Sequence, residues 1–119
     1  MILDTNVIIR LMKGDHDVLR LLESWEESVS TTVVNVYEVL KGRGDLVSLL
    51  EKFVIYHLTE MEVKIASDLY KRLKSSGRAK GDVDILIASI AISHNETLVT
   101  FDRDFQDMME FGLKAVILG

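Results

Sequence analysis

Four acidic side chains, spread over almost the whole chain, are the groups whose type and setting point to chemistry. Asp4 follows a short apolar run, Glu38 and Asp84 lie in segments with apolar patterning, and Asp102 follows another apolar run. Successive acids are separated by 34, 46 and 18 residues. Carboxylates that meet in a fold repel one another and raise their own pKa values unless a cation offsets their charge. Mg²⁺ or Mn²⁺ would do this, because hard cations take oxygen ligands and leave positions open for phosphate oxygens.

The elements that must position these acids alternate along the chain. Apolar patterning predicts strands near 2–3, 29–31, 54–58, 98–100 and 115–118, and helices near 7–12, 17–28, 33–41, 45–53, 60–75, 83–94 and 102–110. Alternation of this kind favours a three-layer α/β/α sandwich with a central parallel sheet of four or five strands. Such sheets carry their chemistry outside the carboxyl ends of the strands, where we expect the four acids to meet.

Polar residues mark where several of these helices begin. Thr5 or Asn6 is expected to cap the first helix, and Asp82 to cap the apolar helix that follows it. Thr59, with Glu62 three residues later, has the pattern of a capping box and predicts a helix start at about residue 60.

Composition limits what the chain can be. With 119 residues, 48% of them hydrophobic, it suits one domain over residues 1–119. The absence of cysteine excludes disulfides, thiolate metal sites and cysteine nucleophiles. A net charge of −5 argues against gripping nucleic acid by bulk positive charge, although metal ions could supply positive charge locally. Without a signal-peptide pattern or a membrane-length apolar run, we expect a cytoplasmic protein with no membrane association.

Other chemistries fit the residues less well. A haloacid dehalogenase-type enzyme needs a second Asp two residues after the first, where this chain has Asn6. A receiver domain needs an Asp at the end of the third strand, where Leu58 and Thr59 stand. The three histidines are scattered and lack metal-ligand spacing, and the serines lack His–Asp partners for a hydrolase triad.

The ordered motifs resemble those of the PIN-domain family, and within it the VapC-type toxins of VapBC toxin–antitoxin pairs. The resemblance covers nearly the whole chain and rests on Asp4-Thr5-Asn6, Glu38, Asp84-Ile85-Leu86-Ile87-Ala88 and Thr100-Phe101-Asp102-Arg103-Asp104-Phe105. It implies a PIN-like α/β/α fold and a Mg²⁺- or Mn²⁺-dependent endoribonuclease that hydrolyses RNA phosphodiester bonds. It also implies a homodimer and a cognate VapB-like antitoxin whose C-terminal segment occupies the acidic site.

Carried over residue by residue, the resemblance assigns roles to the acids and their neighbours. The catalytic and metal-binding residues would be Asp4, Glu38, Asp84 and Asp102, with Thr5, Asn6 and Thr100 in support. Asp104 competes with Asp102 for the place of the fourth acid. Whether one metal ion or two is used stays open.

Five of the fourteen basic residues fall within residues 71–80, and of these Arg78 and Lys80 are candidate RNA-binding residues. A solvated helix end is the equal alternative for this basic run. Two alternatives to the toxin hypothesis remain open. One is a PIN-domain module that binds or processes RNA without a toxin role, and the other is a DNA-directed 5′-nuclease.

Overall fold

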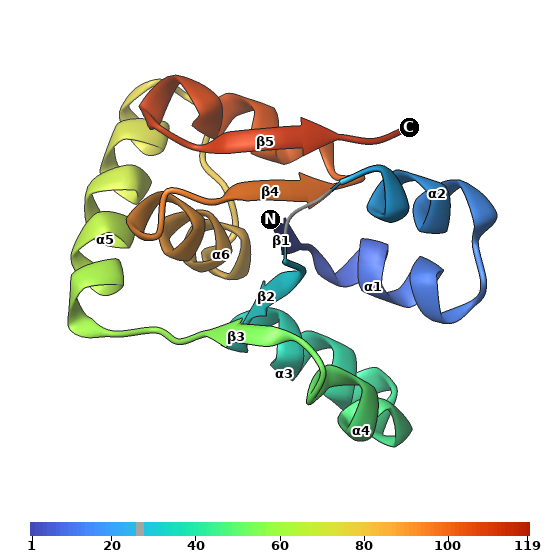
Figure 1. The fold of residues 1–119 in the computed structure, drawn as a ribbon. Coiled ribbons are helices and arrows are strands. Elements are labelled where there is room, and N and C mark those ends of the chain that lie inside the picture. The colour runs from blue at the N-terminus through green and yellow to red at the C-terminus, as the bar shows by residue number, and fades with distance from the viewer. Residues whose placement is uncertain (26–27) are drawn as a thin grey trace.

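The structure is a computed structural model that describes residues 1–25 and 28–119. Its centre is a parallel sheet of five strands in the order β3-β2-β1-β4-β5 (Figure 1). The strands are β1 (Ile2–Leu3), β2 (Ser30–Thr32), β3 (Val54–Tyr56), β4 (Thr97–Thr100) and β5 (Lys114–Ile117). The helices are α1 (Thr5–Met12), α2 (His16–Ser24), α3 (Val33–Gly42), α4 (Val47–Leu50), α5 (Glu60–Ser75) and α6 (Asp82–Ser93). Two 3₁₀ helices, η1 (Gly44–Leu46) and η2 (Arg103–Phe111), complete the described elements.

The two faces of the sheet are covered by different helices because successive strand residues point to opposite faces. Ile2 of β1 and its neighbour Leu98 of β4 pack into a core with α5, α6 and η2. The next pair, Leu3 and Val99, packs into a second core with α1, α2, α3 and α4. Figure 1 shows α5 and α6 on one side of the strands and α1 and α2 on the other. The predicted three-layer α/β/α fold with a parallel sheet is therefore confirmed.

The strand order places a topological switch point beside β1. From β1 the chain builds β2 and β3 outward on one side, and then crosses to build β4 and β5 on the other side. The order therefore reverses between β1 and β4, and a parallel sheet opens a crevice at such a switch point, outside the carboxyl ends of the strands. Asp4 directly follows β1, and Phe101 and Asp102 follow β4. The topology thus brings residues that are almost a hundred positions apart to one edge.

Two predicted helix caps were wrong. Asp4 itself, and neither Thr5 nor Asn6, caps α1, because its carboxylate accepts the backbone N–H of Thr5. Gly81 occupies the N-cap of α6, so Asp82 is the first residue of the helix and not its cap.

Several predicted boundaries also differ from the structure. The second helix ends at Ser24 and not near 28, and residues 26–27 of that prediction lie outside the described residues. The single helix predicted over 45–53 forms η1 and α4 instead. The third strand ends at Tyr56, two residues before Leu58. The helix predicted over 102–110 is the 3₁₀ helix η2, capped by Asp102.

Over the described part of the chain, no helix combines the length and the apolar character that crossing a bilayer requires.

Helix α5 starts where the capping-box pattern predicts. Glu62 is only 2% exposed, and its carboxylate accepts the backbone N–H of Thr59 at 3.3 Å and the hydroxyl of Thr59 at 2.9 Å. Ser93 Oγ, at the end of α6, donates to the same carboxylate at 3.3 Å. Burial raises the pKa of Glu62, but the hydrogen bonds from Thr59 and Ser93 outweigh it and hold the pKa below its usual range. Glu62 therefore joins the start of α5 to the end of α6.

Replacing this carboxylate tests its structural role. Glu62→Ala should lower the free energy of unfolding by about 1–2 kcal/mol, because a buried helix cap and a link between two helices are lost. The wild-type advantage should be full above the usual pKa of a glutamate and should shrink as the pH falls, because the folded-state pKa is the lower one. Urea unfolding at neutral and acidic pH measures both effects. Glu60→Ala, at the exposed side chain two residues earlier, is the control, and an equal loss in both variants would contradict the assignment.

Candidate metal centre

Asp4 is the buried centre of the candidate site, with 6% of its surface exposed. Its Oδ1 accepts hydrogen bonds from the backbone N–H of Thr5 and from Asn35 Nδ2, both at 2.9 Å. Its Oδ2 accepts one from Thr100 Oγ1 at 2.6 Å. Burial raises the pKa of Asp4, and these hydrogen bonds oppose that rise only in part. An ionised carboxylate has about four lone-pair positions, so Oδ2 keeps room for a further partner.

Asn35, on α3, orients Asp4. Its fully buried amide donates to Asp4 Oδ1 and, at 3.0 Å, to Thr5 Oγ1. Its own Oδ1 accepts from Thr32 Oγ1 at 2.7 Å. Thr32 is also the N-cap of α3, where its Oγ1 accepts the backbone N–H of Asn35 at 3.1 Å. Because the amide nitrogen of Asn35 donates to two acceptors and the amide oxygen accepts from Thr32, the orientation of the amide beside Asp4 is fixed.

The same network extends to Glu38. Thr5 Oγ1 accepts from Asn35 and donates to Glu38 Oε1 at 2.7 Å. Glu38 lies three residues after Asn35 on α3, and residues at that spacing share one helix face. The charge of Glu38 adds to the rise in the pKa of Asp4. Thr5 therefore donates a hydrogen bond to each of two carboxylates that repel each other: its backbone N–H to Asp4 and its hydroxyl to Glu38.

Thr100 connects Asp4 to the segment after β4. Its Oγ1 donates to Asp4 Oδ2 and accepts the backbone N–H of Asp102 at 3.0 Å. Asp102 then caps η2, and its Oδ1 accepts the backbone N–H of Asp104 at 2.9 Å. A single buried hydroxyl thus fixes where η2 begins relative to Asp4.

Three carboxylates gather at this edge. One oxygen each from Asp84, Asp102 and Asp104 lies within 4.8 Å of the others. Asp84 belongs to the first turn of α6. Burial first, and then the charges of Asp102, Asp4, Glu38 and Asp104, raise the pKa of Asp84 to about 6. The five acids therefore share one electrostatic environment, and protonation of Asp84 relieves part of their repulsion.

The donor set fits a hard divalent cation. All the charged donors are carboxylate oxygens, which Mg²⁺ and Mn²⁺ prefer. Two oxygens bound at about 2.1 Å to one ion are at most about 4.2 Å apart. The oxygens of Asp84, Asp102 and Asp104 already lie within 4.8 Å of one another, so movements of their side chains alone would be enough to bring them around one ion. An ion there would also favour the charged form of Asp84.

The predicted site residues fall into two groups in the structure. Asp4, Glu38, Asp84 and Asp102 are brought to one place, with Asp104 beside them, and Thr5 and Thr100 are the hydroxyls that link them. Asn6 is different, because it is exposed on α1 and its side chain makes no hydrogen bond to any other part of the chain that the structure describes.

Arg78 and Lys80, predicted to contact RNA, make ion pairs with η2. Lys80 Nζ lies 2.7 Å from Asp107 Oδ2 and 3.8 Å from Asp104 Oδ1. Arg78 pairs with Glu110 and lies 3.8 Å from Asp107 Oδ1. Both cations are therefore already engaged by carboxylates.

Sequence reasoning missed Asn35. The signal was present, because Asn35 follows Thr32, a polar residue directly before a predicted helix, by three residues and precedes Glu38 by three. A polar residue at that spacing, among apolar neighbours, faces the same side of the helix as the predicted acid.

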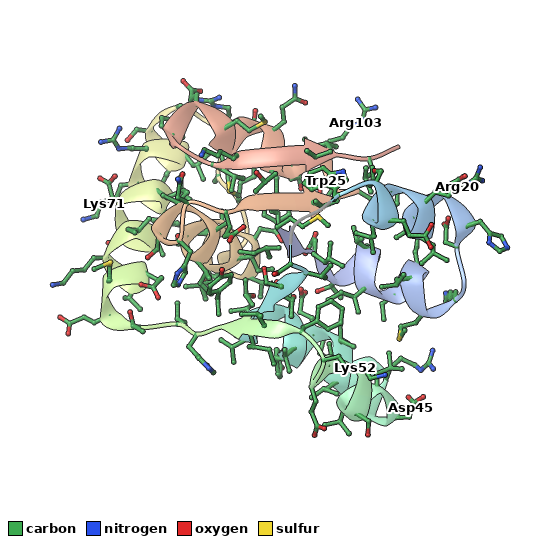
Figure 2. The ribbon with its side chains drawn as sticks, in the orientation of Figure 1. Arg20, Trp25, Asp45, Lys52, Lys71 and Arg103 are labelled. Atoms are coloured by element: carbon green, nitrogen blue, oxygen red, sulfur yellow. The ribbon has the colours of Figure 1, made fainter. Side chains whose placement is uncertain are left out.

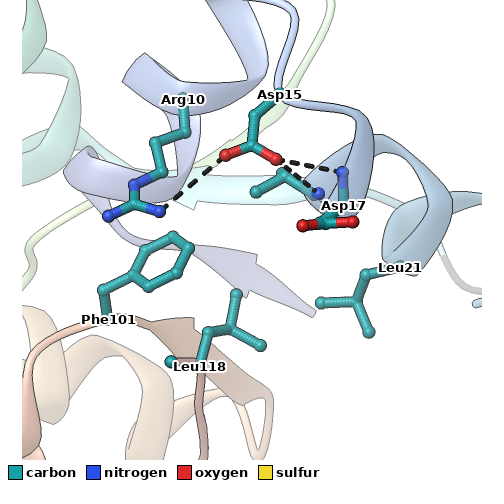
Figure 3. Close-up of a pocket in the computed structure, with 8 residues that line it drawn as sticks. Arg10, Asp15, Asp17, Leu21, Phe101 and Leu118 are labelled. Atoms are coloured by element: carbon teal, nitrogen blue, oxygen red, sulfur yellow. Dashed lines mark hydrogen bonds and ion pairs between the residues drawn. The ribbon is translucent and has the colours of Figure 1, made fainter.

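A cavity of about 410 Å³, drawn in Figure 3, is lined by none of the clustered acids. Its lining comes from α1, the start of α2 and the ends of β4 and β5, namely Arg10, Asp15, Asp17, Val18, Leu21, Phe101, Leu118 and Gly119. Asp15 lies 3.8 Å from Arg10 and also accepts the backbone N–H groups of Asp17 and Val18, as the dashed lines in Figure 3 show. Asp15 thus has its partners within the protein.

The fold and the site together define an α/β domain with an acidic cluster at the switch point of a parallel sheet. The model of the PIN domain matches residues 1–110. The chain therefore belongs to the PIN-domain family, and the predicted resemblance is confirmed.

Curated relatives are named as ribonucleases. Ribonuclease VapC1 of Methanocaldococcus jannaschii is 31% identical over 120 residues, which cover 95% of this chain and 84% of that protein. Ribonuclease VapC3 of the same organism is 28% identical over 91 residues, covering 75% of this chain and 95% of that protein.

Solved structures share the fold. That of VapBC-1 from nontypeable Haemophilus influenzae has a TM-score of 0.83 at 24% identity, covering 98% of this chain and 96% of that chain. That of DNA-bound VapBC from Salmonella typhimurium has a TM-score of 0.82 at 18% identity, covering 98% of this chain and 96% of that chain.

The pKa of Asp84 provides a test of the shared electrostatic environment. In metal-free protein its carboxyl should titrate near pH 6, and Asp102→Asn should lower that pKa more than Asp104→Asn, because the charge of Asp102 raises it more. Carboxyl ¹³C NMR titration measures the pKa of Asp84 in the wild type and in the two variants. Since the folded protein holds this proton above the usual pKa of 3.8, the shift makes stability fall as pH rises from about 4 to about 6. This fall in stability between about pH 4 and about pH 6 should be absent in Asp84→Asn. An Asp84 pKa that does not change in Asp102→Asn would contradict the arrangement.

Proposed function

We propose that this chain is a metal-dependent endoribonuclease and the toxin of a type II toxin–antitoxin pair. The main support is that oxygens of Asp84, Asp102 and Asp104 lie within 4.8 Å of one another. Asp4 is buried close by, and its charge contributes to the raised pKa of Asp84. Its substrate class follows the relatives, one of which is a ribonuclease with 31% identity over 95% of this chain.

The cofactor would be Mg²⁺ or Mn²⁺, held by Asp84 and Asp4 directly, with Asp102 or Asp104 as the further acid and Glu38 as a ligand or as an acceptor for water. When bound, such a cation supplies positive charge at the scissile phosphate and lowers the pKa of a coordinated water. RNA phosphates would otherwise be repelled by a chain of net charge −5.

The chain's own residues prepare this pocket. Thr100 and Asn35 hold the carboxylate of Asp4 in one orientation, so that its remaining lone pair on Oδ2 points in a fixed direction. Thr5 donates to one oxygen of Glu38, which leaves the other oxygen to accept a proton from an attacking water. Fixed acceptors of this kind need little reorganisation during a reaction.

The partners follow from the same site. A VapB-like antitoxin would place a cationic side chain among these acids, where five carboxylates raise the local negative potential. A homodimer would cover apolar side chains that are exposed in the single chain, among them Tyr37, Met61 and Val63, which are at least 50% exposed. The supporting role of Asn6 stays a prediction.

Cleavage of RNA tests the proposal. Purified protein should cut single-stranded or structured RNA when Mg²⁺ or Mn²⁺ is present, and excess chelator should stop it. Asp4→Asn should lower the rate by at least about 10²-fold, because a charged acceptor at the centre of the pocket is lost. A gel assay of labelled RNA measures both results.

Two controls separate the alternatives. Asp17→Asn removes an acid on α2, outside the cluster, and should cut RNA as the wild type does. Circular dichroism should show that Asp4→Asn is folded. Cleavage that persists in excess chelator would contradict the proposal, and metal-independent RNA binding without cleavage would favour the PIN-domain RNA-binding module. Preference for DNA flaps or ends over RNA would favour the 5′-nuclease.

A further inference from the structure

Three acids of η2 form a row. Asp104, Asp107 and Glu110 recur at every third residue. A 3₁₀ helix has 3.0 residues per turn and rises about 2.0 Å per residue, so side chains at this spacing are eclipsed and repeat about every 6 Å. In an α-helix, with 3.6 residues per turn, the same residues would drift around the axis. The 3₁₀ form of η2 is therefore what aligns these carboxylates.

Two cations from one short segment match this row. Lys80 Nζ lies between Asp107 and Asp104, at 2.7 and 3.8 Å, and Arg78 lies between Asp107 and Glu110. Along the row, acids and bases alternate in the order Asp104, Lys80, Asp107, Arg78, Glu110. We refer to these five side chains as the charge ladder. The segment that carries its two bases leads directly from Gly77 into α6, which begins at Asp82.

The ladder is partly shielded from water. The Lys80 side chain is only 13% exposed, and those of Arg78 and Asp107 are 32% and 37% exposed. The guanidinium of Arg78 also lies 5.5 Å from the centre of the Phe111 ring, at the end of η2. The bond to Lys80 lowers the pKa of Asp107, and the bond to Asp107 raises the pKa of Lys80. Pairs with this much burial are screened less by salt than fully exposed ones.

We propose that Arg78 and Lys80 are positioning residues for the metal pocket: the charge ladder fastens η2 to the segment before α6 and so holds Asp102 and Asp104 beside Asp84. The inference rests on the proposed function, because it takes this acidic cluster as the metal pocket.

The ladder acts against two tendencies that would open the pocket. Repulsion between Asp84 on α6 and the acids of η2 drives the two elements apart when no cation is present. In addition, η2 is nine residues long, whereas 3₁₀ runs beyond three or four residues are uncommon and need support. Lys80 lies four residues before Asp84. The ion pairs of Lys80 therefore attach η2 to the chain close to Asp84. A cation engaged in this way would have to leave its carboxylates before it could bind an RNA phosphate.

Asp107→Asn is the variant that separates positioning from RNA binding. It removes the negative charge that pairs with both Lys80 and Arg78, but it removes no proposed metal ligand and neither of the two basic side chains. We expect Mn²⁺ to bind about fivefold more weakly in calorimetry, equivalent to about 1 kcal/mol. We also expect faster hydrogen exchange at the backbone amides of η2, measured without metal. RNA affinity in the absence of metal should stay within about twofold of the wild type.

Asp45→Asn is the matched control. Asp45 pairs with Arg43, at 3.0 Å, and both side chains are exposed. Figure 2 shows Asp45 beside α4, at the end of the molecule away from η2. This variant changes the net charge by the same amount, and its Mn²⁺ affinity and η2 exchange should equal those of the wild type.

The sign of a second variant excludes a simple charge effect. Lys80→Met removes a positive charge near the pocket, which by charge alone would tighten Mn²⁺ binding. If Lys80 is a positioning residue, Lys80→Met should bind Mn²⁺ more weakly instead. The loss of binding free energy in the double variant with Asp107→Asn should then be smaller than the sum of the two single losses. If Asp107→Asn does not fold, Glu110→Gln removes only the ion pair between Arg78 and Glu110. It should weaken Mn²⁺ binding by a smaller factor.

The outcomes are distinguishable. If the wild type binds Mn²⁺ and Asp107→Asn binds it equally well, the positioning role is overturned while the proposed function stands. If Asp107→Asn instead binds RNA more tightly at unchanged Mn²⁺ affinity, Arg78 and Lys80 are RNA-binding residues, and the inference is overturned. A wild type that binds no Mn²⁺ overturns the proposed function and this inference with it, even if the exchange data show that the ladder holds η2.

Discussion

Repulsion among carboxylates at the end of β1 and β4 is the constraint on which the rest of this structure depends. The strand order reverses there, so the topology brings acids from four separate segments to one edge. Burial and the charges of these neighbours raise the pKa of Asp84 to about 6. A fold that only had to be stable would gain by dispersing these charges. Their retention at one edge of the sheet therefore supports the proposed cation site.

Neutral donors and fixed cations handle this repulsion in different places. Around Asp4, the hydroxyls of Thr5 and Thr100 and the amide of Asn35 stabilise the carboxylate without adding charge. This leaves the pocket negative enough for a divalent ion. Around η2, Lys80 pairs with Asp107 and lies 3.8 Å from Asp104, so a positive charge stabilises acids of that element. The first set fixes individual carboxylate oxygens, and the second fixes the element that carries them. Together they give a pocket that is organised before any ion enters.

The sequence was sufficient to predict the fold class and the meeting of four acids at one edge of the sheet, because strand alternation and ordered acidic motifs are local signals. Helix α5 was predicted with its correct bounds, since the pair Thr59 and Glu62 marks its start chemically. The cap of α1 was not, because Asp4 serves both as cap and as site residue. The 3₁₀ form of η2, and the pairing of Arg78 and Lys80 with it, depend on contacts between distant segments. Propensity along a single segment carries no information on such contacts.

The central claim is that these acids meet in order to bind one class of ion, and diffraction from crystals grown with Mn²⁺ tests it most directly. Anomalous scattering locates Mn²⁺ without reference to any assumed chemistry. We expect an anomalous peak at bonding distance from Asp4 Oδ2, from an oxygen of Asp84 and from an oxygen of Asp102 or Asp104. At saturating Mn²⁺, a peak elsewhere on the chain, or none in the pocket, would contradict it.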